Sequence, residues 1–173
     1  MLPRLRRYGS RMKLQKITPH LWYAKEAEEA ARFYASVFPD SRVDRVTPMP
    51  IDTPSGPAGS VKIVEFTLLG QAFQAISAGP LDEFNHAISF VVLCDDQAEL
   101  DRYWDGLLAG GGHAEQCGWL RDRFGLAWQI VPAAFPAMMT SPDREKAKRA
   151  ATAMMKMVKL DIATLQAAFD GKL

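Results

Sequence analysis

The stretch Cys117-Gly118-Trp119-Leu120-Arg121-Asp122-Arg123-Phe124-Gly125-Leu126-Ala127-Trp128-Gln129-Ile130-Val131-Pro132 decides the fold of this chain. Its apolar residues alternate or run together, and its charged residues gather only near the middle. This pattern predicts two antiparallel strands joined by a tight turn over residues 122–125.

An earlier stretch repeats the second half of this hairpin. Residues 70–76 and residues 125–131 both place glycine first, alanine two residues later, then an aromatic residue and glutamine. Two further pairs match in the same order: the ends of two helix-like segments, 31–34 and 101–104, and two histidines that each open an apolar segment, His20 and His86. The matches predict two copies of one strand–helix–strands unit.

Hydrophobic spacing assigns the elements of both copies. Strands are predicted at 17–23, 42–47, 60–69, 71–77 and 86–94, and helices at 26–38, 96–109, 143–158 and 162–169. The predicted fold is therefore α+β: two βαβββ modules that form a cupped mixed sheet, followed by a pair of C-terminal helices. The predicted division is a basic, disordered arm (1–12), the first module (13–79), the second module (80–135) and the helices (136–173), with 13–173 forming one domain.

Composition excludes several functional classes. Apolar residues make up 48% of the 173 residues, charged residues make up 24%, and the net charge is +1. A chain so close to neutral does not favour a nucleic-acid surface, and no apolar segment approaches the roughly 20 residues of a membrane helix. The two cysteines, Cys94 and Cys117, lie in or beside strand-like segments of a chain without a secretory signal, which favours the reduced cytoplasm.

Several segments resemble a known family. They are Ile17-Thr18-Pro19-His20-Leu21-Trp22, Phe84-Asn85-His86-Ala87-Ile88-Ser89-Phe90 and the 117–125 run. Together they resemble the PhnB-like branch of the vicinal-oxygen-chelate superfamily (glyoxalase, bleomycin resistance, extradiol dioxygenase), over roughly residues 14–171. The resemblance implies a small-molecule ligand and a homodimer.

The PhnB-like branch is often labelled 3-demethylubiquinone-9 3-methyltransferase. Common S-adenosylmethionine enzymes need a glycine-rich turn between a strand and a helix. The glycine cluster of this chain, 110–112, follows a predicted helix instead. We therefore take the label as a family name and not as an activity.

The resemblance also implies four metal ligands, one from the first strand and one from the last strand of each module: His20, Gln74, His86 and Gln129. The family favours glutamate at the last-strand positions, and two glutamines leave the charge of a divalent ion uncompensated. Two interpretations stay open. In the first, both modules hold a divalent ion, the only cofactor candidate, and the protein is a lyase, isomerase or dioxygenase. In the second, the four residues line a metal-free polar pocket. We favour the second.

Strand alternation places both glutamines on one face, with Phe73 and Trp128 packing against helices on the other. Five further residues could form the walls of the pocket, although each also has an ordinary structural role: Trp22, Phe66, Phe90, Trp119 and Arg123. The sequence identifies neither a catalytic residue nor a substrate.

Overall fold

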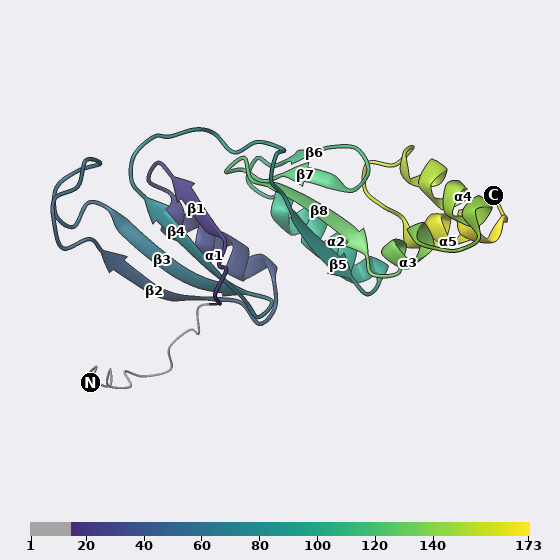
Figure 1. Cartoon of the computed structure of the whole chain (residues 1–173), viewed down its shortest axis with the longest axis horizontal. Coiled ribbons are helices and arrows are strands. Elements are labelled where there is room, and N and C mark those ends of the chain that lie inside the picture. Colours follow the sequence, from purple (N-terminus) through teal and green to yellow (C-terminus); the bar gives the residue numbers. More distant parts are fainter. Residues whose placement is uncertain (1–14) are drawn as a thin grey trace. The chain divides into compact units, whose positions relative to one another are not determined.

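A computed structural model describes residues 15–173 of the chain. The predicted basic arm at 1–12 lies outside these residues. The described residues divide into two compact units, with the boundary between Asp82 and Glu83, and each is described below by itself (Figure 1).

The first unit is one βαβββ module. It comprises β1 (His20–Tyr23), α1 (Ala27–Val37), β2 (Arg42–Pro48), β3 (Lys62–Leu68) and β4 (Gln71–Ser77). The strands lie in the order β1-β4-β3-β2, with β1 parallel to β4 and the other pairs antiparallel. The β3–β4 turn takes positive φ at both Leu69 (47°) and Gly70 (79°), as a tight hairpin turn requires.

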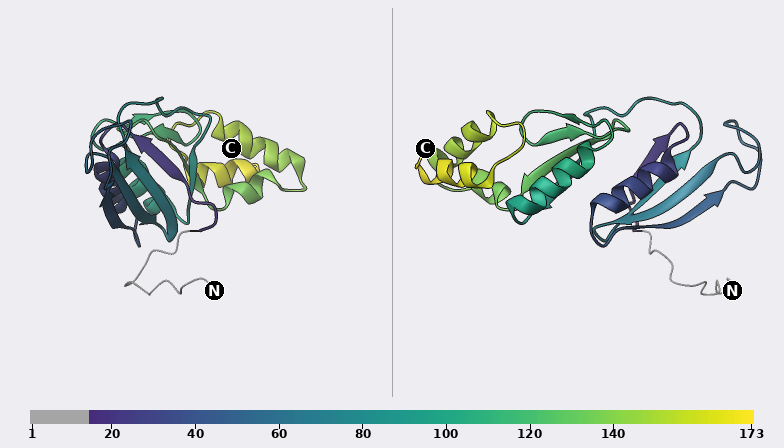
Figure 2. Two further views of the ribbon diagram at one scale, coloured as in Figure 1. Left: turned by 60° about the vertical axis from the view of Figure 1, so that its left-hand side comes forward. Right: turned by 180° about the vertical axis from the view of Figure 1, so that it is seen from behind.

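Helix α1 covers one face of this sheet, as seen from behind in Figure 2. Its buried residues follow helical spacing and end with Tyr34, whose ring lies 6.4 Å from that of Phe66. Phe66 in turn stacks on Phe73 at 5.2 Å between ring centroids. The core of the first module therefore lies between α1 and the face that carries Phe66 and Phe73.

The second unit repeats this arrangement. It contains β5 (Phe90–Cys94), α2 (Gln97–Leu108), β6 (His113–Ala114), β7 (Trp119–Arg121) and β8 (Ala127–Pro132), with the strands ordered β5-β8-β7-β6. The shared strand order confirms the predicted pair of βαβββ modules, each with its own four-stranded mixed sheet. The strand predicted to open at His86 begins at Phe90. Before it, the Asn85 side chain accepts a hydrogen bond from the Ala87 amide (2.8 Å) and holds that segment in a turn.

The predicted hairpin at 117–132 is confirmed, and a buried carboxylate holds its turn. Asp122 is 4% exposed, and its side chain accepts hydrogen bonds from the Phe124 amide (2.8 Å), the Leu126 amide (3.2 Å) and the Trp128 indole (2.8 Å). These bonds join both strands across the turn and bury the Trp128 ring on the side of α2.

Three helices follow the second sheet: α3 (Phe135–Met139), α4 (Arg144–Met154) and α5 (Ile162–Asp170). The predicted helix pair corresponds to α4 and α5, while the short α3 was not predicted. Helix α4 ends four residues before its predicted end, because the carbonyls of Met157 and Val158 accept hydrogen bonds from the amides of Cys117 and Gly118 (both 2.8 Å). Across residues 15–173, no helix is both long and apolar enough to cross a membrane.

Candidate functional site

A row of polar residues crosses the open face of the first sheet, the face opposite α1. His20 on β1 is the register partner of Gln74 on β4, and Gln74 is the partner of Glu65 on β3. Register partners project to the same face, and Glu65 continues the row through its ion pair with Arg45 on β2. The side chains of His20 and Gln74 form no hydrogen bond with any residue of the described part of the chain. They remain available to a ligand.

The two aromatic residues predicted at the pocket of the first module lie on different faces. Trp22 lies two residues after His20 on the open face, half-buried, and its indole donates to the Gly79 carbonyl (2.9 Å). Phe66 is fully buried against α1 instead. Its neighbour Glu65 takes the open face, because strand residues alternate between the two faces.

On the second sheet, Gln129 lies between Val91 on β5 and Trp119 on β7. Its side-chain amide donates to the Ser89 hydroxyl (2.8 Å). Phe90 lies on the opposite face, where its ring is 5.5 Å from that of Trp128. Of the two aromatic residues predicted at this pocket, Trp119 reaches the open face and Phe90 packs with the helix-side core.

His86 lies in the turn before β5 and is held by a carboxylate. Its Nε2 is 2.6 Å from Oε2 of Glu115, and Oε1 of Glu115 accepts a hydrogen bond from Nε of Arg121 (2.9 Å). The His86 ring lies 5.8 Å from the Trp119 ring. We call His86, Glu115, Arg121 and Trp119 the histidine cluster.

The electrostatics of the histidine cluster favour an ionised Glu115. Burial by itself would raise the pKa of Glu115, but the hydrogen bonds from His86 and Arg121 outweigh burial and lower it. An ionised carboxylate only accepts hydrogen bonds, so Nε2 of His86 donates to Glu115, and in a neutral imidazole this leaves Nδ1 as an acceptor. An imidazole positioned in this way can accept a hydrogen bond or a proton from a bound molecule.

Glu115 was not predicted from the sequence, and Arg123 lies elsewhere. Glu115 follows a two-residue strand and carries no motif, so only the fold reveals that it contacts His86. Arg123, predicted at the pocket, is exposed at the hairpin turn with its guanidinium 4.8 Å above the Phe124 ring.

The strand registers correct one part of the predicted repeat. On the first sheet the partner of Gln74 is His20, and on the second sheet the partner of Gln129 is Val91. When the two glutamines are aligned, Val91 takes the position of His20. The match between His20 and His86 was therefore wrong, because His86 precedes the strand that pairs with β8.

Comparison with known proteins identifies the family. Residues 15–131 match the sequence profile of the family described as 3-demethylubiquinone-9 3-methyltransferase. The chain belongs to this family. The match confirms the PhnB-like branch of the vicinal-oxygen-chelate superfamily, but it ends before α3, so the C-terminal helices lie beyond it. Among curated proteins, none matches this PhnB-like chain.

Solved structures agree with this assignment. A PhnB protein of Bacillus cereus, described as 3-demethylubiquinone-9 3-methyltransferase, is 30% identical, with a TM-score of 0.59 over 69% of this chain and 100% of its own. The fosfomycin resistance protein FosX of Listeria monocytogenes is 13% identical, with a TM-score of 0.54 over 73% of this chain and 98% of its own. The second likeness concerns the fold alone.

The four ligands implied by the superfamily fit a divalent ion poorly. All four are neutral, so they offer no charge compensation. Within the described residues, no group of three or more His, Cys, Asp or Glu side chains could hold a metal ion.

Proposed function

We propose that this PhnB-like protein binds a small molecule on the open face of its second sheet, at the histidine cluster and Gln129. The observation that supports the proposal is the orientation of His86 by Glu115 (2.6 Å), which is itself held by Arg121 (2.9 Å), beside the half-buried Trp119 ring. Polar groups fixed by neighbouring side chains lose little freedom on binding, and an aromatic ring adds apolar contact area.

The side-chain atoms of the site that have no hydrogen-bond partner among the described residues indicate the chemistry of the ligand. Nδ1 of His86 accepts hydrogen bonds, and so does the side-chain oxygen of Gln129, whose nitrogen is engaged by Ser89. Trp119 and the exposed Val91 offer apolar contacts on the same face. The expected ligand is therefore a small molecule with an apolar or aromatic part and at least two hydrogen-bond donors.

Methyl transfer is not part of this proposal. In the described part of the chain, the three strand-to-helix connections, residues 24–26, 95–96 and 133–134, contain no glycine, so none forms a glycine-rich turn at a helix N-terminus. We propose a cytoplasmic location, because Cys94 and Cys117 are both free thiols and suit a reducing compartment.

Native mass spectrometry of the purified protein, followed by a fragment screen read by ¹⁵N NMR, tests the proposal. The expected result is a ligand that shifts the Trp119 indole and Gln129 side-chain signals and binds at least about tenfold more weakly to His86→Ala. The matched control is His113→Ala, which removes an exposed histidine of β6. Equal affinity of the two variants, or no ligand that shifts these signals, contradicts the proposal.

A metal-dependent lyase, isomerase or dioxygenase is the competing function, and one double substitution separates it. Gln74→Glu with Gln129→Glu should lower the melting temperature, because Gln74 already lies beside Glu65 and added carboxylates repel. Under our proposal, adding Ni²⁺, Mn²⁺ or Zn²⁺ does not restore the melting temperature of the double variant. Recovery with any of the three ions would favour a coordination sphere instead.

A further inference from the structure

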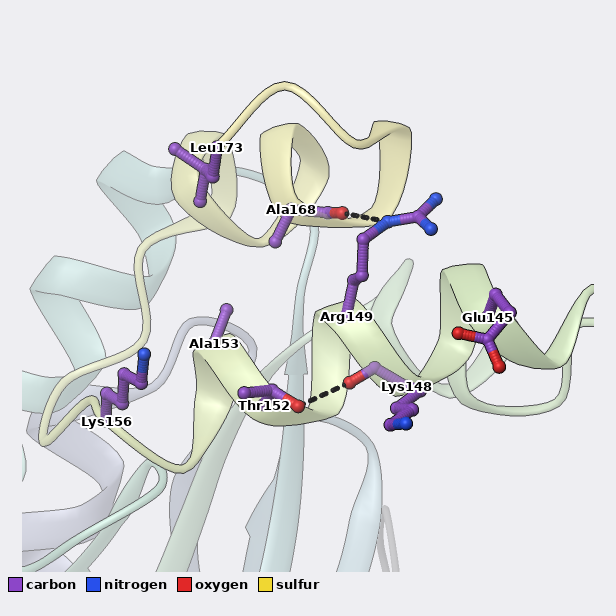
Figure 3. A pocket seen from close by; sticks show the side chains of 8 residues that line it. All are labelled: Glu145, Lys148, Arg149, Thr152, Ala153, Lys156, Ala168 and Leu173. Atoms are coloured by element: carbon purple, nitrogen blue, oxygen red, sulfur yellow. Dashed lines mark hydrogen bonds between the residues drawn. The ribbon is translucent and has the colours of Figure 1, made fainter.

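Helices α4 and α5 enclose a cleft of about 360 Å³ beyond the part of the chain that matches the family (Figure 3). Its volume falls within the range of small-molecule sites. The cleft is lined by Glu145, Lys148, Arg149, Thr152, Ala153, Lys156, Ala168 and Leu173.

The charge of the cleft is not compensated. Three cationic residues line it against one anionic residue, Glu145. Lys148 and Lys156 form no ion pair with any of residues 15–173, whereas Lys159 contacts Asp101 and Asp105 (3.1 and 3.3 Å). Residues 135–173 contain seven Lys or Arg and four Asp or Glu, a net charge of +3 in a chain whose total is +1.

Arg149 builds the cleft and is already engaged. Its Nε donates to the Ala168 carbonyl (3.0 Å) and its Nη2 donates to the Phe169 carbonyl (2.9 Å). These bonds satisfy carbonyls in the last turn of α5 and hold the two helices together. The two lysines are left as the cations that a ligand can use.

The rest of the lining is small and apolar. Ala153 and Ala168 contribute only methyl groups, and Leu173 adds an aliphatic side chain on the α5 side, as Figure 3 shows. The Thr152 hydroxyl donates to the Lys148 carbonyl (2.8 Å), so its oxygen remains an acceptor. The cleft thus combines free cationic groups with a short apolar surface.

We propose that the α4–α5 cleft binds a small organic anion. The ammonium groups of Lys148 and Lys156 supply the positive charge that attracts it, and Ala153, Ala168 and Leu173 contact an apolar body. Lysine ammonium groups bind phosphate and carboxylate as point charges. This site shares no residue with the histidine cluster, so either proposal can fail without the other.

A matched pair of probes tests the charge requirement on the full chain labelled with ¹⁵N. 1-Naphthyl phosphate should shift the backbone amides of Thr152, Ala153 and Ala168, and its affinity should fall as salt is raised. The neutral analogue 1-naphthol should leave these amides unshifted at the same concentration. Equal shifts with the two probes, or phosphate shifts confined to Trp119 and Gln129, would overturn the proposal.

Single substitutions identify the cations. Lys148→Gln and Lys156→Gln should each weaken 1-naphthyl phosphate binding by about fivefold or more. Lys172→Gln is the matched control, since it removes the same charge from a lysine that follows α5, is paired with Asp170 (3.4 Å) and does not line the cleft. An equal loss of affinity in the control would show attraction to net charge alone and contradict a defined site.

Discussion

Buried polar side chains can be indispensable to a turn when several donors depend on one acceptor, and Asp122 is such a residue. It serves two backbone amides and the Trp128 indole at 4% exposure. Asp122→Ala leaves these three donors unpaired and should lower the free energy of unfolding by about 3 kcal/mol, roughly 1 kcal/mol for each bond. Urea denaturation measures the change. Asp82→Ala, at an exposed residue between the modules, is the control. A loss below about 0.5 kcal/mol contradicts this role.

At the residue scale, the alternation of residues along a strand predicted which face of the sheet a side chain takes. It did not predict which side chains contact one another. Alternation correctly placed Gln74 and Gln129 opposite Phe73 and Trp128, because the two-residue period of a strand is a local property. The contact between His86 and Glu115 joins residues 29 apart through the placement of β6 and the β5 turn. Spacing along the sequence carries no signal for such a contact.

Gly118 couples the hairpin to the C-terminal segment. It has a positive φ (81°), and an added Cβ would lie 2.9 Å from the Ile130 carbonyl oxygen and 3.0 Å from Leu160. Gly118→Ala should therefore lower the melting temperature by more than Gly125→Ala. Gly125 has a similar φ (86°) but open space around it. Gly125→Ala is therefore the control, because it introduces backbone strain without a steric clash. Equal effects in thermal unfolding would mean that the close approach to Leu160 is not needed.

At the scale of elements, the first turn of α2 carries a pH-dependent contribution to stability. The hydrogen bond from Tyr103, followed by that from the Asp95 amide (both 2.7 Å), lowers the pKa of Glu99 below 4.5. Because the folded-state pKa is lowered, this stabilisation is present above about pH 4.5 and is lost as the pH falls through the folded-state pKa.

Glu99→Gln should accordingly destabilise the protein by about 1 kcal/mol at pH 7, and the difference from wild type should shrink as the pH falls well below 4.5. Thermal unfolding across this pH range measures it. Glu83→Gln, at an exposed residue outside the helix, removes an equal charge as the control. A difference that stays constant with pH would show that the ionised form of Glu99 is not what stabilises the turn.

Element types were predictable where the periodicity was long, and element ends were not. Asp96 caps α2 by accepting a hydrogen bond from the Glu99 amide (2.8 Å), as an aspartate before a helical pattern commonly does. The end of α4 was misplaced because hydrogen bonds to the hairpin, and not local propensity, determine it.

At the scale of the whole molecule, we propose that the protein is a homodimer. β5 lies at the edge of its sheet and presents Val91 and Leu93, which are 55% and 53% exposed. An unpaired edge with apolar side chains favours association with a second copy. Light scattering at tens of micromolar should give about twice the 19.2 kDa of one chain.

Leu93→Lys should shift this equilibrium toward the monomer, since a charge on the edge disfavours pairing. Ile51→Lys places the same charge at a residue that is 63% exposed in the loop after β2, and it should leave the mass unchanged. A wild-type monomer at this concentration would refute the dimer.

The parallel pairing of β1 with β4 has a consequence for the newly synthesised chain. In each module the first strand along the chain pairs with the last. The first sheet therefore cannot be completed until Ser77 has left the ribosome, and the second cannot be completed until Pro132 has left it. At roughly 5 to 20 residues per second, the first module has about 3 to 10 seconds to fold before the last strand of its neighbour emerges. Successive completion limits pairing between the similar β4 and β8 segments during synthesis, and we expect slow elongation to favour correct folding.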